Sequence, residues 1–238
     1  MNEPLFLALA LAALAGVTIP LGAALAGVER LLPGWSRDEF RHTVIAFGGG
    51  ALLAAIALVL VPQGSDLLQP LPALAWFAAG GIVFMQLDRL LARRGGHGAQ
   101  FMAMMLDYVP EAMALGALLA DNLQLAILLA GLIALQNLPE GFNAFRELSA
   151  NPAQSPRRLM FLFVCMVPLG PLSAYLGMAV LGGYPQVLGA IMMFSAGGIL
   201  YLLFEDVAPQ VPLDQKWNPP LGAVAGFMLG LAGHLFIG

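Results

Sequence analysis

Eight apolar stretches dominate the pattern of hydrophobic and polar positions along the 238-residue chain. Proline, glycine and charged residues separate the stretches, and each is close to the ~20 residues that an α-helix needs to cross a hydrocarbon layer of ~30 Å. The pattern therefore predicts eight transmembrane helices. They cover roughly residues 4–26, 42–62, 71–91, 100–120, 122–146, 158–181, 185–208 and 217–237.

Composition supports a membrane protein. The chain is 60% hydrophobic and only 10% charged, whereas a soluble domain has about 25% charged residues. We therefore expect an all-α integral membrane protein with a single transmembrane domain over residues 1–238, since no connection is long enough for a separate soluble domain. The N-terminal Met-Asn-Glu-Pro lacks the basic flank of a cleavable signal peptide, so the first stretch is expected to remain as a helix.

The basic residues predict an orientation in the membrane. All ten lie on alternate connections, whereas residues 63–70, 121–122 and 182–186 contain none. Because basic loops stay in the cytoplasm, both chain termini are expected outside. The ten residues are Arg30, Arg37, Arg41, Arg89, Arg93, Arg94, Arg146, Arg157, Arg158 and Lys216.

Acidic residues occur deep inside the fourth and fifth stretches. Asp107-Tyr-Val-Pro-Glu111 and Gln136-Asn-Leu-Pro-Glu140 share the pattern polar-x-x-Pro-Glu. An ionised carboxylate in hydrocarbon costs at least ~2.5–3.5 kcal/mol, so each needs a partner. Neither stretch has Lys, Arg or His at that depth, which makes a bound cation the simplest partner. The alternative is a protonated, hydrogen-bonded structural cluster.

The spacing of these groups predicts that they face one another. Asp107 and Glu111 are four residues apart and share a helix face, as do Gln136 and Glu140. The first pair lies ~10 and ~16 Å above the cytoplasmic start of its helix. Glu140 and Gln136 lie ~9 and ~15 Å above the cytoplasmic end of theirs. We therefore expect Asp107 opposite Glu140 and Glu111 opposite Gln136. Asn143 shares this face.

Two prolines lie inside these motifs. Pro110 and Pro139 each lack an N–H and crowd the carbonyl one turn earlier. Both helices are therefore expected to be broken at the proline, which would make the carbonyls of Leu106 and Leu135 further candidate ligands. Irregular backbone at membrane depth is tolerated where it lines a cavity.

The second and seventh stretches resemble each other. Residues 47–50 (Phe-Gly-Gly-Gly) and Pro62-Gln63 match residues 194–197 (Phe-Ser-Ala-Gly) and Pro209-Gln210 at the same separation. The loop charges give the two stretches opposite directions, and inverted repeats are typical of transporters with alternating access. The alternative is that small residues and a closing proline are simply common in membrane helices.

Together these motifs resemble the ZIP (Zrt/Irt-like) family of divalent metal transporters, particularly its bacterial branch, over nearly the whole chain. The resemblance implies eight helices in an inverted 3+2+3 repeat, with both termini outside and metal-binding Pro-Glu motifs on helices 4 and 5. It implies metal ligands at Asp107, Glu111, Gln136, Asn137 and Glu140.

The same resemblance implies exit-side metal ligands at Glu205 and Asp206, near the cytoplasmic end of the seventh stretch. An acidic helix end at the water boundary is the alternative, because charge near the interface costs little. Asp88 either joins this pair or forms an ion pair with Arg89 or Arg94.

The sequence departs from the family pattern at two places. The family's His-Asn-x-Pro-Glu-Gly reads Asp-Tyr-Val-Pro-Glu-Ala here, with Tyr108 in place of a second-metal ligand, and Val167-Pro168 stands where bacterial relatives often have Glu-Pro. One metal is therefore expected rather than two. Ligands without His or Cys suit harder cations such as Mn²⁺ or Fe²⁺. The family resemblance favours zinc, so zinc is the first candidate and manganese or iron the alternative.

The implied function is uptake of a divalent metal across the bacterial inner membrane, with helices 1, 4, 5 and 6 moving against 2, 3, 7 and 8 in an elevator-like motion. The metal is cargo, and we expect no cofactor, no nucleic-acid partner and no enzymatic activity. Formation of a homodimer is left open by the sequence. Two alternative functions are a metal sensor that does not transport and an intramembrane metalloenzyme, although the chain lacks a His-Glu-x-x-His motif.

Overall fold

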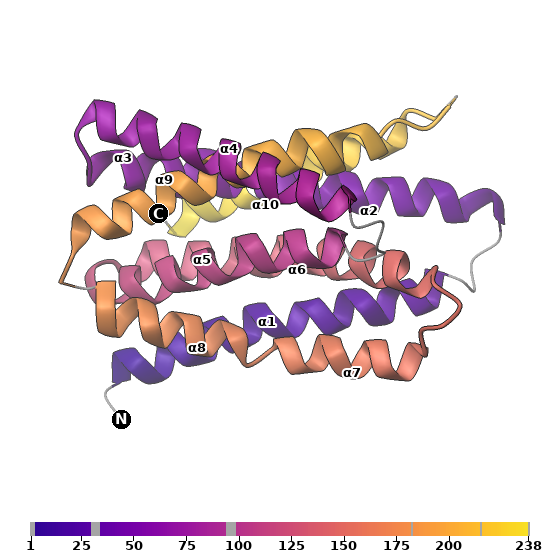
Figure 1. The fold of residues 1–238 in the computed structure, drawn as a ribbon, viewed down its shortest axis with the longest axis horizontal. Helices are drawn as coiled ribbons and strands as arrows, with labels where there is room; N and C mark the ends of the chain where they lie inside the picture. The colour runs from indigo at the N-terminus through magenta and orange to yellow at the C-terminus, as the bar shows by residue number, and fades with distance from the viewer. Residues whose placement is uncertain (1–2, 30–33, 94–98, 182, 215, 238) are drawn as a thin grey trace.

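All eight expected stretches are helical in the computed structural model (Figure 1), which describes residues 3–29, 34–93, 99–181, 183–214 and 216–237. Every regular element in these ranges is a helix, apart from one isolated bridge between Leu213 and Lys216. Five stretches form single helices, namely α1 (Glu3–Glu29), α4 (Pro70–Arg93), α5 (Ala99–Asp121), α6 (Leu123–Ser149) and α10 (Asn218–Ile237). Three form consecutive segments, namely α2 (Gly34–Ala55), η1 (Ile56–Leu60) and α3 (Val61–Asp66); α7 (Pro156–Met166), α8 (Leu169–Leu176) and η2 (Gly177–Leu181); and α9 (Pro185–Leu202), η3 (Leu203–Val207) and η4 (Ala208–Gln210).

The helices are those of a multi-pass membrane protein. Seven helical spans in the described residues are long and apolar enough to cross a membrane. Large apolar side chains such as Phe6, Leu71, Phe161 and Leu235 are exposed, as expected where lipid rather than water is the solvent. The helical membrane-protein class is thus confirmed. Helix α5 has 23 residues and occupies the place of the expected fourth span, but it is not one of the seven, so the count of eight spans stays a prediction.

The start of α1 and the finish of α10 lie at the same end of the bundle (Figure 1). The elements that carry the basic residues reach the opposite end, where α1, α4, α6 and η4 finish and α2, α5, α7 and α10 begin. Arg30 and Arg94 lie outside the described residues. The basic residues of the described chain, which lie on alternate connections in the sequence, are therefore gathered at one end of the bundle.

The helices pack as two bundles. Helices α1, α5, α6, α7 and α8 pack on one another and form the first bundle, while α2, α3, α4, α9 and α10 form the second. The two bundles meet mainly where α2 crosses α6, with smaller contacts between α5 and α9 and between α6 and α10. Figure 1 shows α5 and α6 between the α4–α9 pair above and α1 with α8 below. Helix α6 is therefore central to the whole structure.

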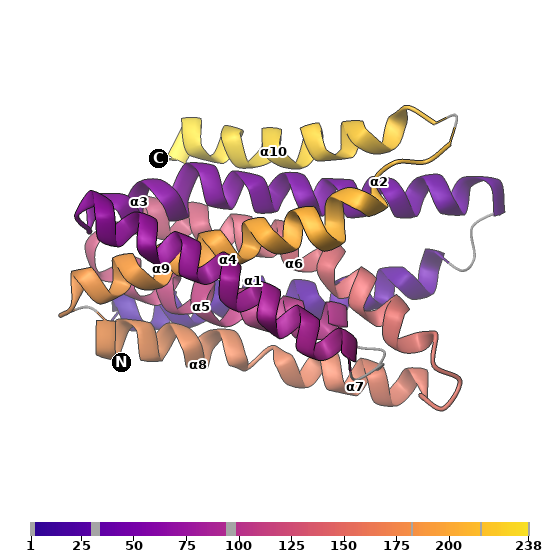
Figure 2. The ribbon, with the colours of Figure 1, turned by 45° about the horizontal axis from the view of Figure 1, so that its top comes forward.

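The two similar stretches share an unusual backbone feature. Segments η1 and η3 are π-helical, and each starts nine residues after the matching phenylalanine, Phe47 or Phe194. Single π-turns are rare and are found most often at functional sites. Helices α2 and α9 run in opposite directions in Figure 2. The sixth stretch also contains a π-helical segment, η2, whereas α1 is a continuous α-helix, so the π-turns do not decide between a repeat and a common arrangement of small residues and proline.

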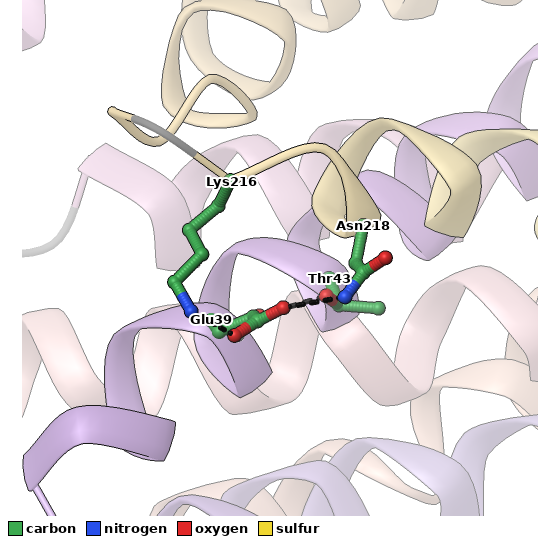
Figure 3. A network of polar contacts seen from close by, with 4 residues as sticks. All are labelled: Glu39, Thr43, Lys216 and Asn218. Atoms are coloured by element: carbon green, nitrogen blue, oxygen red, sulfur yellow. Dashed lines mark hydrogen bonds and ion pairs between the residues drawn. The ribbon is translucent and has the colours of Figure 1, made fainter.

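A polar network connects the starts of α2 and α10 (Figure 3). The Nδ2 of Asn218 donates to Glu39 Oε1 at 2.7 Å, and Lys216 Nζ lies 3.0 Å from Glu39 Oε2. Thr43 Oγ1 donates to the main-chain oxygen of Glu39 at 2.7 Å. Because solvent screens these groups, the network orients the two helix starts more than it stabilises the fold.

Close backbone approach, rather than large side chains, holds α2 against α10. A Cβ atom added at Gly226 would overlap the carbonyl oxygen of Phe47, and one added at Gly50 would overlap that of Ala223. Small residues at a helix crossing let dispersion forces act between backbones, which matters in lipid because no hydrophobic effect drives helices together there.

Gly226→Ala is expected to lower the free energy of unfolding by about 1–3 kcal/mol, because its Cβ would meet backbone that cannot move aside. The measurement is thermal unfolding in one detergent, followed by circular dichroism. Gly131→Ala on α6 is the matched control, since nothing lies within 4 Å of its Cβ, and it should leave stability unchanged or slightly raised. Equal unfolding temperatures for the two variants would contradict the close α2–α10 contact.

Candidate metal centre

Helices α5 and α6 bring the buried acidic and amide side chains together. Asp107 is 3% exposed, and Glu111 and Gln136 are fully buried. The Nε2 of Gln136 donates to Glu111 Oε2 at 2.5 Å. The carboxyl groups of Asp107 and Glu140 lie within hydrogen-bonding reach of each other. Both pairings predicted from depth along the two helices are therefore present.

The prolines do not break the two helices, so that expectation is wrong. Helix α5 continues from Ala99 to Asp121 through Pro110, and α6 continues from Leu123 to Ser149 through Pro139. A proline removes one helical hydrogen bond, and neighbouring helices can support the backbone around it. The interruption lies instead at Val167-Pro168, between α7 and α8. The site is thus built from side chains on continuous helices.

Five side-chain oxygens of this site are buried without a hydrogen-bond partner in the described part of the chain. They are Asp107 Oδ1, Glu111 Oε1, Gln136 Oε1, Asn137 Oδ1 and Glu140 Oε2. A buried polar atom without a partner costs free energy, and a buried carboxylate costs more. Three carboxyl groups in mutual electrostatic contact need either protons or a cation between them. The donor set, all oxygen, fits a divalent cation.

The arrangement is not a finished metal site. Among the described residues, no group of three or more side chains of the types His, Cys, Asp or Glu is placed to hold a metal ion. One candidate ligand is an amide, Gln136, whose nitrogen faces Glu111. The two ends of an amide are assigned from the hydrogen bonds they make, and a half-turn brings its oxygen to the same place. Binding of a cation therefore requires side-chain rotation in the site.

Two of the motif residues face α1 rather than the carboxylates. The O–H of Tyr108 points at the carbonyl of Ala12, 3.5 Å away, and a Cβ on Gly170 would overlap this hydroxyl. Asn137 Nδ2 donates to the carbonyl of Ala15 at 3.2 Å. Tyr108 thus fills the space between α1 and α8, and Asn137 anchors α6 to α1 while its Oδ1 has no partner.

A small cavity extends the site toward the second bundle. It has a volume of about 20 Å³ and is lined by Glu140 and Asn143 on α6, Gly48 on α2 and Val207 in η3. A space of this size holds one water molecule. Asn143, which sequence analysis placed on the shared face, therefore lies beside Glu140 at the junction of the two bundles.

A second acidic group lies next to this cavity. Glu205 and Asp206 occupy η3, and their side chains lie within hydrogen-bonding reach of each other. Asp88 on α4 and Glu147 on α6 are close enough to act on Asp206 electrostatically. Asp88 Oδ2 accepts from the Tyr201 hydroxyl at 3.0 Å. No pattern in the sequence points to Glu147 or Tyr201, because these side chains approach Asp206 and Asp88 only in the tertiary structure.

A comparison with known proteins found one similar curated protein. The chain is 24% identical to the zinc transporter ZupT of Chlorobium limicola (strain DSM 245 / NBRC 103803 / 6330). The alignment covers 95% of this chain and 94% of that relative. No family model matches the chain. The likeness therefore extends over the whole bundle rather than over a single motif.

Tyr108→Phe is expected to change zinc affinity by less than about twofold, a difference of about 0.4 kcal/mol, because the hydroxyl faces α1. Glu111→Gln is expected to lower the affinity at least about tenfold, since even indirect contacts to a metal contribute that much. Calorimetric titration of the purified protein with Zn²⁺ measures both. A loss of affinity in Tyr108→Phe as large as that in Glu111→Gln would place the tyrosine in the site.

Proposed function

Because the chain belongs to the ZIP (Zrt/Irt-like) family, we propose that it transports a divalent metal cation across the membrane toward the cytoplasm. Zinc is the first candidate, in keeping with the name of the relative, and manganese or iron is the alternative. One observation carries the proposal above all others. Buried, partnerless oxygens from two adjacent helices converge at a depth where no basic side chain lies in either helix.

The proposed ligands are Asp107, Glu111, Gln136 and Glu140. In the absence of metal, protons and the Gln136 amide reduce the repulsion between the carboxylates. An arriving cation replaces part of its hydration shell with these oxygens. Its positive charge offsets the repulsion between the buried carboxylates. Asn137 Oδ1 is a further candidate ligand. A site that must rearrange before binding holds its cargo less tightly, which suits release on the other side.

The proposed exit path leads from Glu140 through the small cavity to η3. Asn143 and Val207 line that cavity, and Asp206 immediately precedes Val207. Glu205 and Asp206 are the proposed exit-side ligands, supported by the neighbouring Asp88 and Glu147. Negative charge at the exit raises the local concentration of cations, so this group would draw the metal away from the buried site.

We propose that access alternates by movement of the first bundle against the second. The packing supports this division, because contacts within each bundle exceed those between them. A Cβ added at Gly48 would lie 2.5 Å from the Pro139 ring carbon Cγ. The missing side chain therefore lets α6 pass close to α2 beside the metal ligands.

The proposed orientation has both chain termini outside and the basic connections in the cytoplasm, in a bacterial inner membrane. It rests on the basic residues of the described chain at one end of the bundle, and on the start of α1 and the finish of α10 at the other. The protein acts as a transporter in this proposal, not as an enzyme. A metal sensor or an intramembrane metalloenzyme built on the same carboxylates would give no flux, so measured flux separates the three functions.

Uptake of labelled Zn²⁺, Mn²⁺ and Fe²⁺ into proteoliposomes tests the transport proposal and ranks the metals. Glu111→Ala and Glu140→Ala are each expected to reduce uptake at least about tenfold, because each removes a ligand from the dehydrated cation. Asp38→Asn is the control, since Asp38 is exposed near the start of α2 and pairs with Arg41 at 3.4 Å. Unchanged flux in both alanine variants would refute the site.

Two glycines test the movement. Gly48→Ala places a methyl group against Pro139 across the bundle junction, whereas nothing lies within 4 Å of a Cβ added at Gly131 on α6. Gly48→Ala is expected to reduce zinc uptake at least about fivefold, a barrier of about 1 kcal/mol. Gly131→Ala should keep most of its uptake. Equal flux in the two variants would contradict movement at this junction.

A further inference from the structure

An apolar groove of about 630 Å³ lies between α5 and the α4–α9 pair. Trp76 on α4, Pro110 and Met113 on α5, and Val187 and Phe194 on α9 line it. Its volume is within the range of about 300–1,000 Å³ seen for sites that hold small organic ligands. The groove therefore offers enough space for an apolar chain.

The groove has a polar mouth. A second cavity of about 370 Å³ is lined by the polar side chains of Asp66, Gln69 and Gln186. The two cavities share Leu68 and Gln186, so they form one continuous depression. One end of it is polar and the other is apolar, which is the pattern of an amphipathic molecule.

The depression has the depth of one membrane leaflet. Its mouth lies where the span Arg37–Asp66 ends and the spans Pro70–Leu90 and Pro185–Gln210 begin. Phe194 is nine residues into the last of these, or ~14 Å at the helical rise of ~1.5 Å per residue. Half of a hydrocarbon layer of ~30 Å is about the same length. A lipid molecule in a single leaflet therefore fits, with its headgroup at the polar mouth and its acyl chain in the apolar groove.

Charge at the mouth selects the headgroup. The carboxylate of Asp66 is exposed and has no hydrogen bond or ion pair to the rest of the described chain. Residues 63–70 and 182–186 contain no Lys or Arg. An anionic headgroup would meet an unpaired negative charge there, whereas an ammonium group would pair with it. A primary ammonium can also donate hydrogen bonds to the carboxylate, which a quaternary ammonium cannot. The amides of Gln69 and Gln186 supply donors for a lipid phosphate.

We propose that this depression is a binding site for a phospholipid whose headgroup carries a primary ammonium, that is, a phosphatidylethanolamine. The ammonium group pairs with Asp66, and one acyl chain fills the groove beside Trp76. Because Pro110 and Met113 belong to the first bundle and the other lining residues to the second, the bound lipid bridges the two bundles one residue from Glu111.

Fluorescence quenching tests the site without a transport assay. In the variant Trp35→Phe/Trp217→Phe, Trp76 is the one remaining tryptophan of the three in the sequence. The full-length variant is reconstituted in phosphatidylglycerol vesicles with a low, fixed mole fraction of lipid brominated on its acyl chain. Brominated phosphatidylethanolamine is expected to quench Trp76 about two- to fivefold more than brominated phosphatidylglycerol, the ratio of one exposed ion pair.

Two variants in that background locate the lipid. Asp66→Asn is expected to remove the preference for phosphatidylethanolamine, and Ala190→Phe, which fills the groove, is expected to reduce quenching by it. The companion variant that keeps Trp217, which is 86% exposed, should show no preference. Equal quenching of Trp76 by both lipids, or by brominated phosphatidylcholine and phosphatidylethanolamine, would overturn the proposal.

Native mass spectrometry of the unmodified chain gives a second measurement, which does not depend on the tryptophan substitutions. Phosphatidylethanolamine adducts should survive in preference to phosphatidylglycerol adducts and should lose that preference in Asp66→Asn. Adducts that form equally with both lipids would overturn the proposal.

Discussion

The free-energy cost of holding three carboxyl groups inside hydrocarbon dominates this structure. Asp107, Glu111 and Glu140 cannot face lipid, so α5 and α6 must lie side by side with these faces together. Other helices must then cover the pair. The central position of α6, in contact with both bundles, follows from that requirement. The amide of Gln136, which donates to Glu111, meets part of the cost, and the partnerless oxygens mark the part that no hydrogen bond in the described chain meets.

The two bundles differ in what they contribute. Both bundles have close backbone contacts at glycines, such as Gly116 in the first and Gly226 in the second, but only the first holds the cluster of Asp107, Glu111 and Glu140. Their junction passes beside Glu140, where Gly48 faces Pro139 and a cavity of about 20 Å³ remains. The carboxyl group of Glu140 therefore lies at the surface where the two bundles meet. Small changes in their relative position would alter the surroundings of Glu140 first.

The sequence was sufficient for the helices and for the pairing of the carboxylates, because both follow from local periodicity and helical rise. The position of Asp107 opposite Glu140 could be predicted from depth alone along two helices joined by a short turn. The sequence was misleading at Pro110 and Pro139, because tertiary packing keeps both helices continuous. The sequence contained no signal for Glu147 and Tyr201, whose approach to Asp206 and Asp88 depends on the crossing of helices far apart in the chain. No local pattern encodes such crossings.

The π-turn in η3 bears on where the acidic side chains of that segment point. A π-turn places one extra residue in a helical turn, so the residues within it are rotated about the helix axis relative to an unbroken α-helix. Glu205 and Asp206 both lie in this turn, directly before Val207 at the small cavity. The backbone, and not only the choice of side chains, therefore orients this acidic pair.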